Sequence, residues 1–163
     1  MDKNEESKLE KLKEDYKKIQ KTYNLPDFVK LNAEFSIEKI AETETDFLVR
    51  EVARVMAEKF SSYLRFVELV LNPANSPMFI FSLIKAMGED EKKKFSEIYK
   101  KLARIELDLI ELDFDFSEQK EADFINNSYK VWTNMKKDSL EIIEKIKSNW
   151  DNKNENNNKG YFG

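Results

Sequence analysis

The chain has 163 residues, 37% of them charged, and its 28 basic against 32 acidic side chains give a formal net charge of −4. It contains no cysteine and no histidine, which argues against a disulfide framework, a zinc knuckle, a thiol nucleophile and the usual general base. Glycine and proline number only three each, too few for the tight turns of a β-sandwich or barrel, so the composition predicts an all-α protein.

The distribution of charge and hydropathy bears on location and partners. The beginning of the chain, MDKNEESKLEKLK, lacks the apolar core of a signal peptide, and no apolar run approaches the ~20 residues that span a bilayer. We therefore expect a cytoplasmic protein without a transmembrane segment. Because basic and acidic residues interleave along a net negative chain, the pattern also argues against nucleic acid as a partner.

Residues 1–24 are predicted to form a charged amphipathic helix that ends before Pro26. Its apolar residues recur at intervals of three and four and make a narrow seam: Leu9, Leu12, Tyr16, Ile19 and Tyr23. A seam of this width fits one partner helix, which can belong to the same chain or to a second copy. The long connection that follows favours a homodimer through the N-terminal helix.

Residues 25–150 are predicted to form a single helical bundle. We expect a short helical turn after Ser36 and then a central helix with Thr45 as its N-cap. This central helix continues to about Leu71 and is apolar over more than half of its circumference. Such a helix must be covered on several sides, so it is expected to lie in the middle of the bundle.

Three further helices follow in the sequence. The segment 78–87, MFIFSLIKAM, is interpreted as a short core helix, although it could also serve as a membrane-surface element or a hydrophobic plug. Helices over 90–113 and from Ser117 to about Trp150 carry the most regular heptad patterns of the chain. The predicted fold is thus an all-α bundle of four to six helices that includes two long antiparallel heptad-patterned helices.

A second apolar stripe lies beside the heptad seam of the helix over 90–113. Leu107, Ile110 and Phe114 recur at helical spacing on a face that the seam does not use. A helix that is apolar on two faces is either sandwiched within its own fold or offers one face to another chain. These side chains are therefore candidate partner-binding residues.

The stretch 106–123 contains eight acidic residues and one lysine. Such a concentration can attract a basic partner, hold a hard cation or remain a solvated corner. The spacing Asp113-x-Asp115-x-Ser117 imitates the start of a calcium loop, but the glycine and the bidentate glutamate of that loop are missing. We assign no metal and no cofactor. The acidic residues chosen as candidate partner-binding residues are Asp108, Glu111 and Asp115.

Residues 151–163 form an Asn-rich tail without periodicity, which is expected to be disordered. Tyr161 and Phe162 near its end could anchor a short linear motif in a partner's pocket, or the tail could have no function.

No catalytic motif is found in the sequence. No pattern in it determines the specific role of the protein. We interpret the protein as a non-enzymatic helical protein–protein interaction module, such as an adaptor, an assembly factor or a subunit of a larger complex. One alternative is an accessory protein associated with nucleic acid in replication or at the ribosome. The other is a carboxylate-lined metal-binding or enzymatic bundle.

Overall fold

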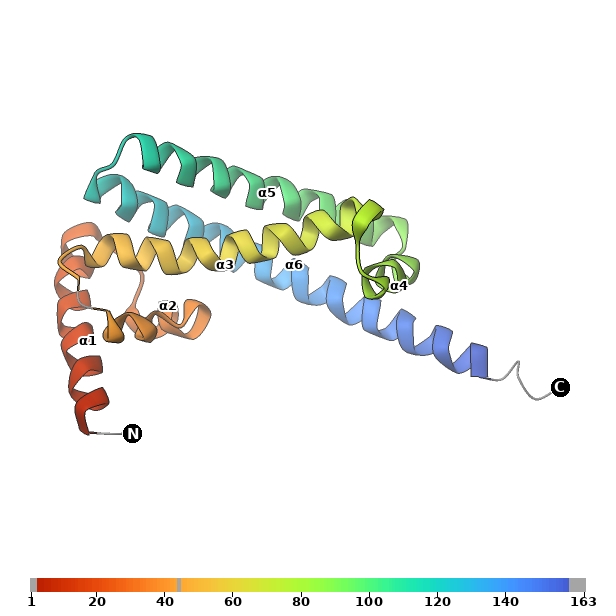
Figure 1. Cartoon of the computed structure of the whole chain (residues 1–163), viewed down its shortest axis with the longest axis horizontal. Helices are drawn as coiled ribbons and strands as arrows, with labels where there is room; N and C mark the ends of the chain where they lie inside the picture. Colours follow the sequence, from red (N-terminus) through yellow and green to blue (C-terminus); the bar gives the residue numbers. More distant parts are fainter. Residues whose placement is uncertain (1–2, 44, 159–163) are drawn as a thin grey trace. The chain divides into compact units, whose positions relative to one another are not determined.

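The computed structural model describes residues 3–43 and 45–158, and over these residues the chain is helical without a strand. The described part contains six α-helices and two short 3-10 helices (Figure 1). Their bounds are α1 Lys3–Tyr23, α2 Phe28–Phe35, η1 Ile37–Glu42, α3 Leu48–Leu71, η2 Pro73–Asn75, α4 Met78–Ala86, α5 Glu89–Phe114 and α6 Glu118–Asn158. The predicted all-α fold is confirmed.

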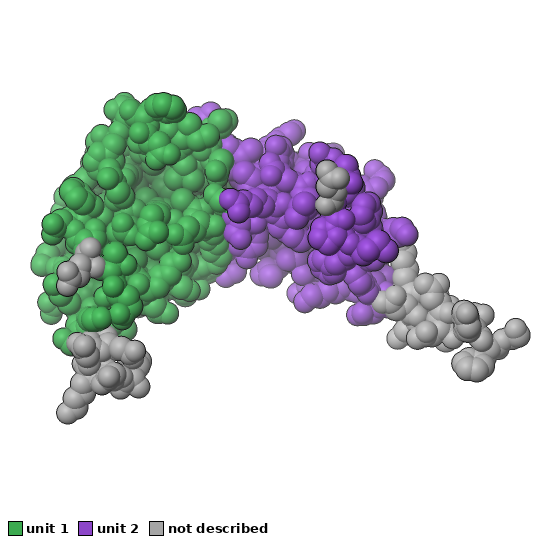
Figure 2. Space-filling model, viewed as in Figure 1, with its two compact units in different colours: residues 1–61, 105–131 green, residues 62–104, 132–163 purple. Residues whose placement is uncertain are grey.

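The chain divides into two compact units, each built from two separate stretches of sequence (Figure 2). Unit 1 comprises Met1–Ser61 and Ile105–Val131, and unit 2 comprises Ser62–Arg104 and Trp132–Gly163. Each boundary between the units falls inside α3, α5 or α6, so each of these helices supplies side chains to both cores.

In unit 1, α1 packs against η1 and α2 of the same chain. Leu12 and Tyr16 from the predicted seam are buried there. The Tyr16 hydroxyl donates a hydrogen bond to the carbonyl of Pro26 at 2.8 Å, and its ring meets Phe28 edge to face at 5.3 Å between centroids. The helix ends at Tyr23, and the next residue, Asn24, has a left-handed φ of 52°. Part of the seam therefore contacts its own unit, and a homodimer through this helix stays a prediction.

Helix α2 was not predicted from the sequence. Its N-cap is Asp27, whose side chain accepts hydrogen bonds from the backbone N–H groups of Val29 at 2.9 Å and Lys30 at 3.3 Å. The predicted turn after Ser36 is confirmed as η1. The prediction of Thr45 as N-cap is wrong, because its hydroxyl accepts from the N–H group two residues later and α3 begins only at Leu48.

The core of unit 1 is formed by apolar side chains of α3, α5 and α6, together with buried residues of α1, α2 and η1 such as Leu31 and Ile37. Its fully buried side chains include Val52, Val55, Met56, Phe60, Ile105, Ala122 and Ile125. The predicted heptad positions of the two long helices thus point inward here. Ser117 caps α6 as predicted, since its hydroxyl accepts from the N–H group of Lys120 at 3.2 Å.

Unit 2 has its own core on the remaining parts of the same helices and on α4. Its buried side chains include Val67, Val70, Ile80, Leu83, Phe95, Leu102, Trp132, Met135 and Ile142. Helix α5 opens with a capping-box contact, in which the Gly88 N–H group donates to Glu91 Oε2 at 2.9 Å. The segment 78–87 is helical as predicted, but only part of it belongs to the core, because Met78 and Phe79 are exposed.

Helix α6 continues past Trp150, whose ring lies 5.7 Å from that of Phe79 in unit 2. Tyr161 and Phe162, the predicted anchors of the tail, lie outside the described residues. Among the residues that are described, no helix is long and apolar enough to cross a membrane.

Candidate functional site

The second apolar stripe of α5 is exposed in unit 1. Leu107, Ile110 and Phe114 are 58%, 47% and 88% exposed, whereas Ile105 and Leu102 on the seam of the same helix are buried. Helical spacing places the three exposed side chains on one face. Of the two alternatives left open by the sequence, sandwiching of this face within its own unit is therefore wrong. We call Leu107, Ile110 and Phe114 the α5 face.

A cleft of about 540 Å³ borders the α5 face at Ile110. Its walls come from α3, α5 and the start of α6. The lining residues are Arg50, Ala53, Arg54, Ala57, Glu106, Leu109, Ile110, Leu112, Asp113, Phe116 and Glu121. Ala53 and Ala57 lie one helical turn apart on α3, and their methyl side chains project only a short distance from the helix. These alanines account for the hollow between α3 and α5.

One end of the cleft is formed by an ion pair between a buried carboxylate and a half-exposed arginine. The Glu121 side chain is only 8% exposed, and its Oε1 accepts from Arg50 Nε at 3.1 Å. Its Oε2 is buried and has no hydrogen-bond partner among the described residues. Burial raises the pKa of Glu121, and this effect outweighs the opposing influence of Arg50. A lining carboxylate with one unpartnered oxygen favours a hydrogen-bond donor or a cation close by.

The Arg50 guanidinium is held in place by aromatic rings as well as by Glu121. Its carbon lies 3.6 Å from the centroid of the Phe116 ring and 5.7 Å from that of Phe47. Both distances are in the range of cation–π contacts. The positive charge of Arg50 is thus already matched by one carboxylate and two aromatic faces of the same unit.

The other arginine of the cleft is also paired within the chain. Arg54 contacts Glu51 at 2.7 Å and Glu58 at 3.0 Å, both on its own helix. On the opposite wall, Glu106 accepts from the hydroxyl of Ser61 at 2.9 Å. Because the arginines are matched by carboxylates, Glu106 and Asp113 leave the wall formed by α5 with an excess of negative charge.

The predicted acidic residues take different positions around the α5 face. Glu111 and Asp113 are exposed and, within the described part of the chain, belong to no ion pair. By helical geometry they fall on opposite sides of the stripe. Asp115 is exposed and paired with Lys120, and Asp108 is half-buried. The structure therefore places Leu107, Ile110, Phe114 and Glu111 beside one another on the exposed side of α5.

The cleft itself was missed in the sequence. The signal that could have indicated it is the pair Ala53 and Ala57 within a helix whose other inward residues are large. No local pattern announces the ion pair between Arg50 and Glu121, since the two residues are 71 positions apart.

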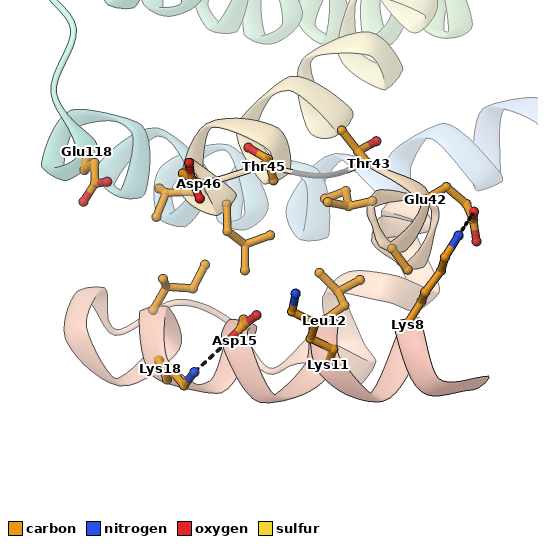
Figure 3. Close-up of a pocket in the computed structure, with 15 residues that line it drawn as sticks. Lys8, Lys11, Leu12, Asp15, Lys18, Glu42, Thr43, Thr45, Asp46 and Glu118 are labelled. Atoms are coloured by element: carbon orange, nitrogen blue, oxygen red, sulfur yellow. Dashed lines mark hydrogen bonds and ion pairs between the residues drawn. The ribbon is translucent and has the colours of Figure 1, made fainter. Parts of the chain in front are cut away.

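A second cleft, of about 810 Å³, lies in unit 1 between α1 and the segment that leads into α3 (Figure 3). Lys8 pairs with Glu42 at 2.8 Å and Lys18 with Asp15 at 2.7 Å, as the dashed lines in Figure 3 show. The other residues that line this cleft include apolar side chains and charged side chains of both signs. Because those two lysines are paired within the chain, this cleft presents no distinct ligand chemistry.

No group of three or more carboxylates suited to a metal ion is found among the described residues. Comparison with protein-family models, with curated proteins and with solved structures finds no match for this chain.

Proposed function

We propose that the protein is a non-enzymatic helical protein–protein interaction module, an adaptor, assembly factor or subunit of a larger complex, that docks a partner on the α5 face. The observation that carries this proposal is the exposure of Leu107, Ile110 and Phe114 on one face of a helix whose opposite face is buried. Clustered large apolar side chains on a surface commonly mark binding sites.

The energetics support a docking role for this face. Burying a Leu, Ile or Phe side chain fully contributes about 1.5–3 kcal/mol, and these side chains retain roughly half or more of that area for a partner. Phe114 is 88% exposed at the last residue of α5, so its ring is available as an aromatic anchor. Buried aromatic anchors beside a pocket are the usual centres of binding energy in protein interfaces.

The α5 face is a better candidate than the other surfaces considered from the sequence. In the seam of α1, Leu12 and Tyr16 are buried within unit 1, so less of that seam is left for a partner. On α4 the exposed Phe79 already lies against Trp150. The α5 face adds an adjoining cleft and carboxylates on both sides, which would give a partner orientation as well as binding energy.

The proposal is tested by purifying the full chain from native lysate with bound proteins. We compare wild type, the triple variant Leu107→Ser, Ile110→Ser, Phe114→Ser, and a matched control in unit 2, Leu140→Ser with Ile143→Ser. The control residues are also exposed and apolar. We expect the same proteins to accompany wild type and control, and to be lost from the triple variant. Circular dichroism spectra should show that all three remain helical.

Two results would contradict the proposal. Either the triple variant retains every protein that wild type retains, or no protein accompanies wild type above the level of an unrelated helical control.

A further inference from the structure

We infer that the segment which docks on the α5 face is an amphipathic helix that carries lysine or arginine beside its apolar stripe, and that one of these cations enters the cleft lined by Glu121. This inference rests on the proposed function and specifies the chemistry of its partner.

Carboxylates flank the α5 face. Glu111 and Asp113 flank the apolar stripe on opposite sides, and both are exposed and outside any ion pair of the described residues. The wider stretch 106–123 contains eight acidic side chains and one lysine. A helix that lays its apolar stripe along Leu107, Ile110 and Phe114 would place its flanking residues against these carboxylates, and basic residues complement them.

The cleft supplies a feature that does not depend on these surface charges. Glu121 is more than nine-tenths buried, and its Oε2 has no hydrogen-bond partner among the described residues. An unmade hydrogen bond at a buried carboxylate is costly. Because Oε2 is closed off from solvent, a cation in the cleft would stabilise this carboxylate through its charge and not through a hydrogen bond to Oε2, and the cleft therefore favours an additional cation. The arginines that line the cleft do not provide it, because Arg54 is engaged with Glu51 and Glu58.

The shape of the cleft fits the stem of a long basic side chain. Ala53, Ala57 and Ile110 supply apolar lining, and Glu106, Asp113 and Glu121 supply carboxylates in the same cleft. Lysine and arginine bury their methylene stems along apolar surface and keep the charge at the tip. An acidic or a purely apolar side chain would satisfy only one part of this lining.

The inference is tested with two synthetic peptides of about 18 residues, which is about five helical turns. Both carry leucine at positions i, i+3, i+4 and i+7, and the remaining positions are lysine in one peptide and glutamate in the other. Binding of each labelled peptide to the full chain is measured by fluorescence polarisation at low and at high salt. We expect the lysine peptide to bind and the glutamate peptide to bind at least about tenfold more weakly.

Variants locate the interaction on the chain. Glu111→Gln and Asp113→Asn should each weaken the lysine peptide by roughly twofold to fivefold, as expected for exposed charges. Glu121→Gln should weaken it by roughly tenfold, because attraction between charges is stronger where the carboxylate is shielded from solvent. Asp123→Asn is the matched control, since it removes one exposed carboxylate of the same acidic stretch away from the α5 face. It should leave the affinity unchanged.

Three outcomes overturn the inference. Equal affinity for both peptides excludes selection for basic residues, and an equal effect of Asp123→Asn and Asp113→Asn reduces the binding to general attraction by negative charge. Absence of binding by either peptide also overturns it. In each case the pull-down of the Leu107, Ile110, Phe114 variant decides separately whether a partner of other chemistry docks on the α5 face.

Discussion

Arg50 and Phe116 are stacked in unit 1, with the guanidinium carbon 3.6 Å from the centroid of the ring. The same guanidinium donates a hydrogen bond from Nε to Oε1 of Glu121 at 3.1 Å. Phe116 lies between α5 and α6, so this contact links α3 to the connection between the other two helices of the unit. The stack also fixes one wall of the cleft, because both residues line it.

Removal of Arg50 is expected to destabilise unit 1. In Arg50→Ala the buried Glu121 loses its charged partner and Phe116 loses its stacking contact. Breaking a fully buried pair costs about 3–5 kcal/mol, and because Arg50 is 45% exposed we expect about 1–3 kcal/mol. The measurement is chemical denaturation, with Arg54→Ala as the control, for which the loss should stay within about 0.5 kcal/mol. The double variant Arg50→Ala, Glu121→Gln should recover part of the loss, and no recovery would mean that packing alone is responsible.

The stability of unit 1 should depend on pH through the titration of Glu121. Burial raises the pKa of this carboxyl in the folded protein above its ordinary value of 4.5. At a pH between the unfolded pKa of 4.5 and the higher folded pKa, the folded state binds more protons than the unfolded state. The contribution of Glu121 to the free energy of unfolding is therefore full below pH 4.5 and decreases as the pH rises through the folded pKa. Denaturation of wild type and Glu121→Gln across this range checks the prediction. Relative to the variant, wild type should lose stability with rising pH.

Glu91 in unit 2 should behave in the opposite way. Burial acts to raise the pKa of Glu91, but the hydrogen bonds from its own and the Gly88 N–H group and the nearby Lys145 outweigh burial and lower it from 4.5. The unfolded state then binds more protons below 4.5, so the stability from this contact is present above that value and is lost as the pH falls through the folded pKa. Glu91→Gln should therefore be less stable than wild type near neutral pH, and the difference should shrink in acid. A difference that grows in acid would contradict the sign.

The two faces of α5 should respond differently to the same substitution. Ile105→Asp places an unpaired charge in the core of unit 1, which costs several kcal/mol against a typical total of about 5–15 kcal/mol, and should abolish cooperative unfolding. Leu107→Asp on the same helix is the matched control, because Leu107 is exposed and should keep the melting temperature of wild type. Val55→Asp on α3 should behave like Ile105→Asp. Thermal melts followed by circular dichroism test all three, and a folded Ile105→Asp variant would show that the core is assigned wrongly.

The packing of α1 within unit 1 is tested by substitution of two of its tyrosines. Tyr16→Phe removes the hydrogen bond to the Pro26 carbonyl but keeps the buried ring, so it should cost about 1 kcal/mol. Tyr23 donates to Glu118 at 2.6 Å on the surface, and Tyr23→Phe should leave the melting temperature unchanged. If both substitutions have the same small effect, the buried hydrogen bond of Tyr16 does not stabilise α1 on the unit.

The parts of the fold that follow from periodicity could be predicted from the sequence. The seams of α5 and α6 repeat at helical spacing, and their buried residues, from Phe95 to Ile105 and from Ile125 to Ile146, are the ones that the pattern indicates. Ser117 could be recognised as a cap because it precedes a regular apolar pattern. The exposure of the α5 face was left open, since a stripe on one helix does not reveal whether another helix covers it.

The missed features depend on contacts that are distant in sequence or confined to a few residues. Helix α2 is short, and its cap at Asp27 directly follows a proline that suggested a loop. Thr45 has the chemistry of an N-cap but uses its hydroxyl in a local turn before α3. The cleft requires Ala53 and Ala57 to stand opposite α5 and Arg50 to meet Glu121, and neither relation is encoded in a local pattern.

The division of three helices between the units has a consequence for synthesis on the ribosome. The first stretch of unit 1 ends at Ser61, but the partners of its apolar side chains, such as Ile105 and Ile125, are made only after the first stretch of unit 2. During that interval Val52 and Met56 lack the side chains of α5 and α6 that complete the core of unit 1, although Phe60 already has the ring of Phe35 at 5.6 Å between centroids. Domains that wait for distant segments expose apolar surface while they grow and are prone to associate with other chains. The nascent protein should therefore depend on chaperones until α6 has emerged. Because each unit is built from two separate stretches of the chain, neither unit can be expressed as one continuous fragment.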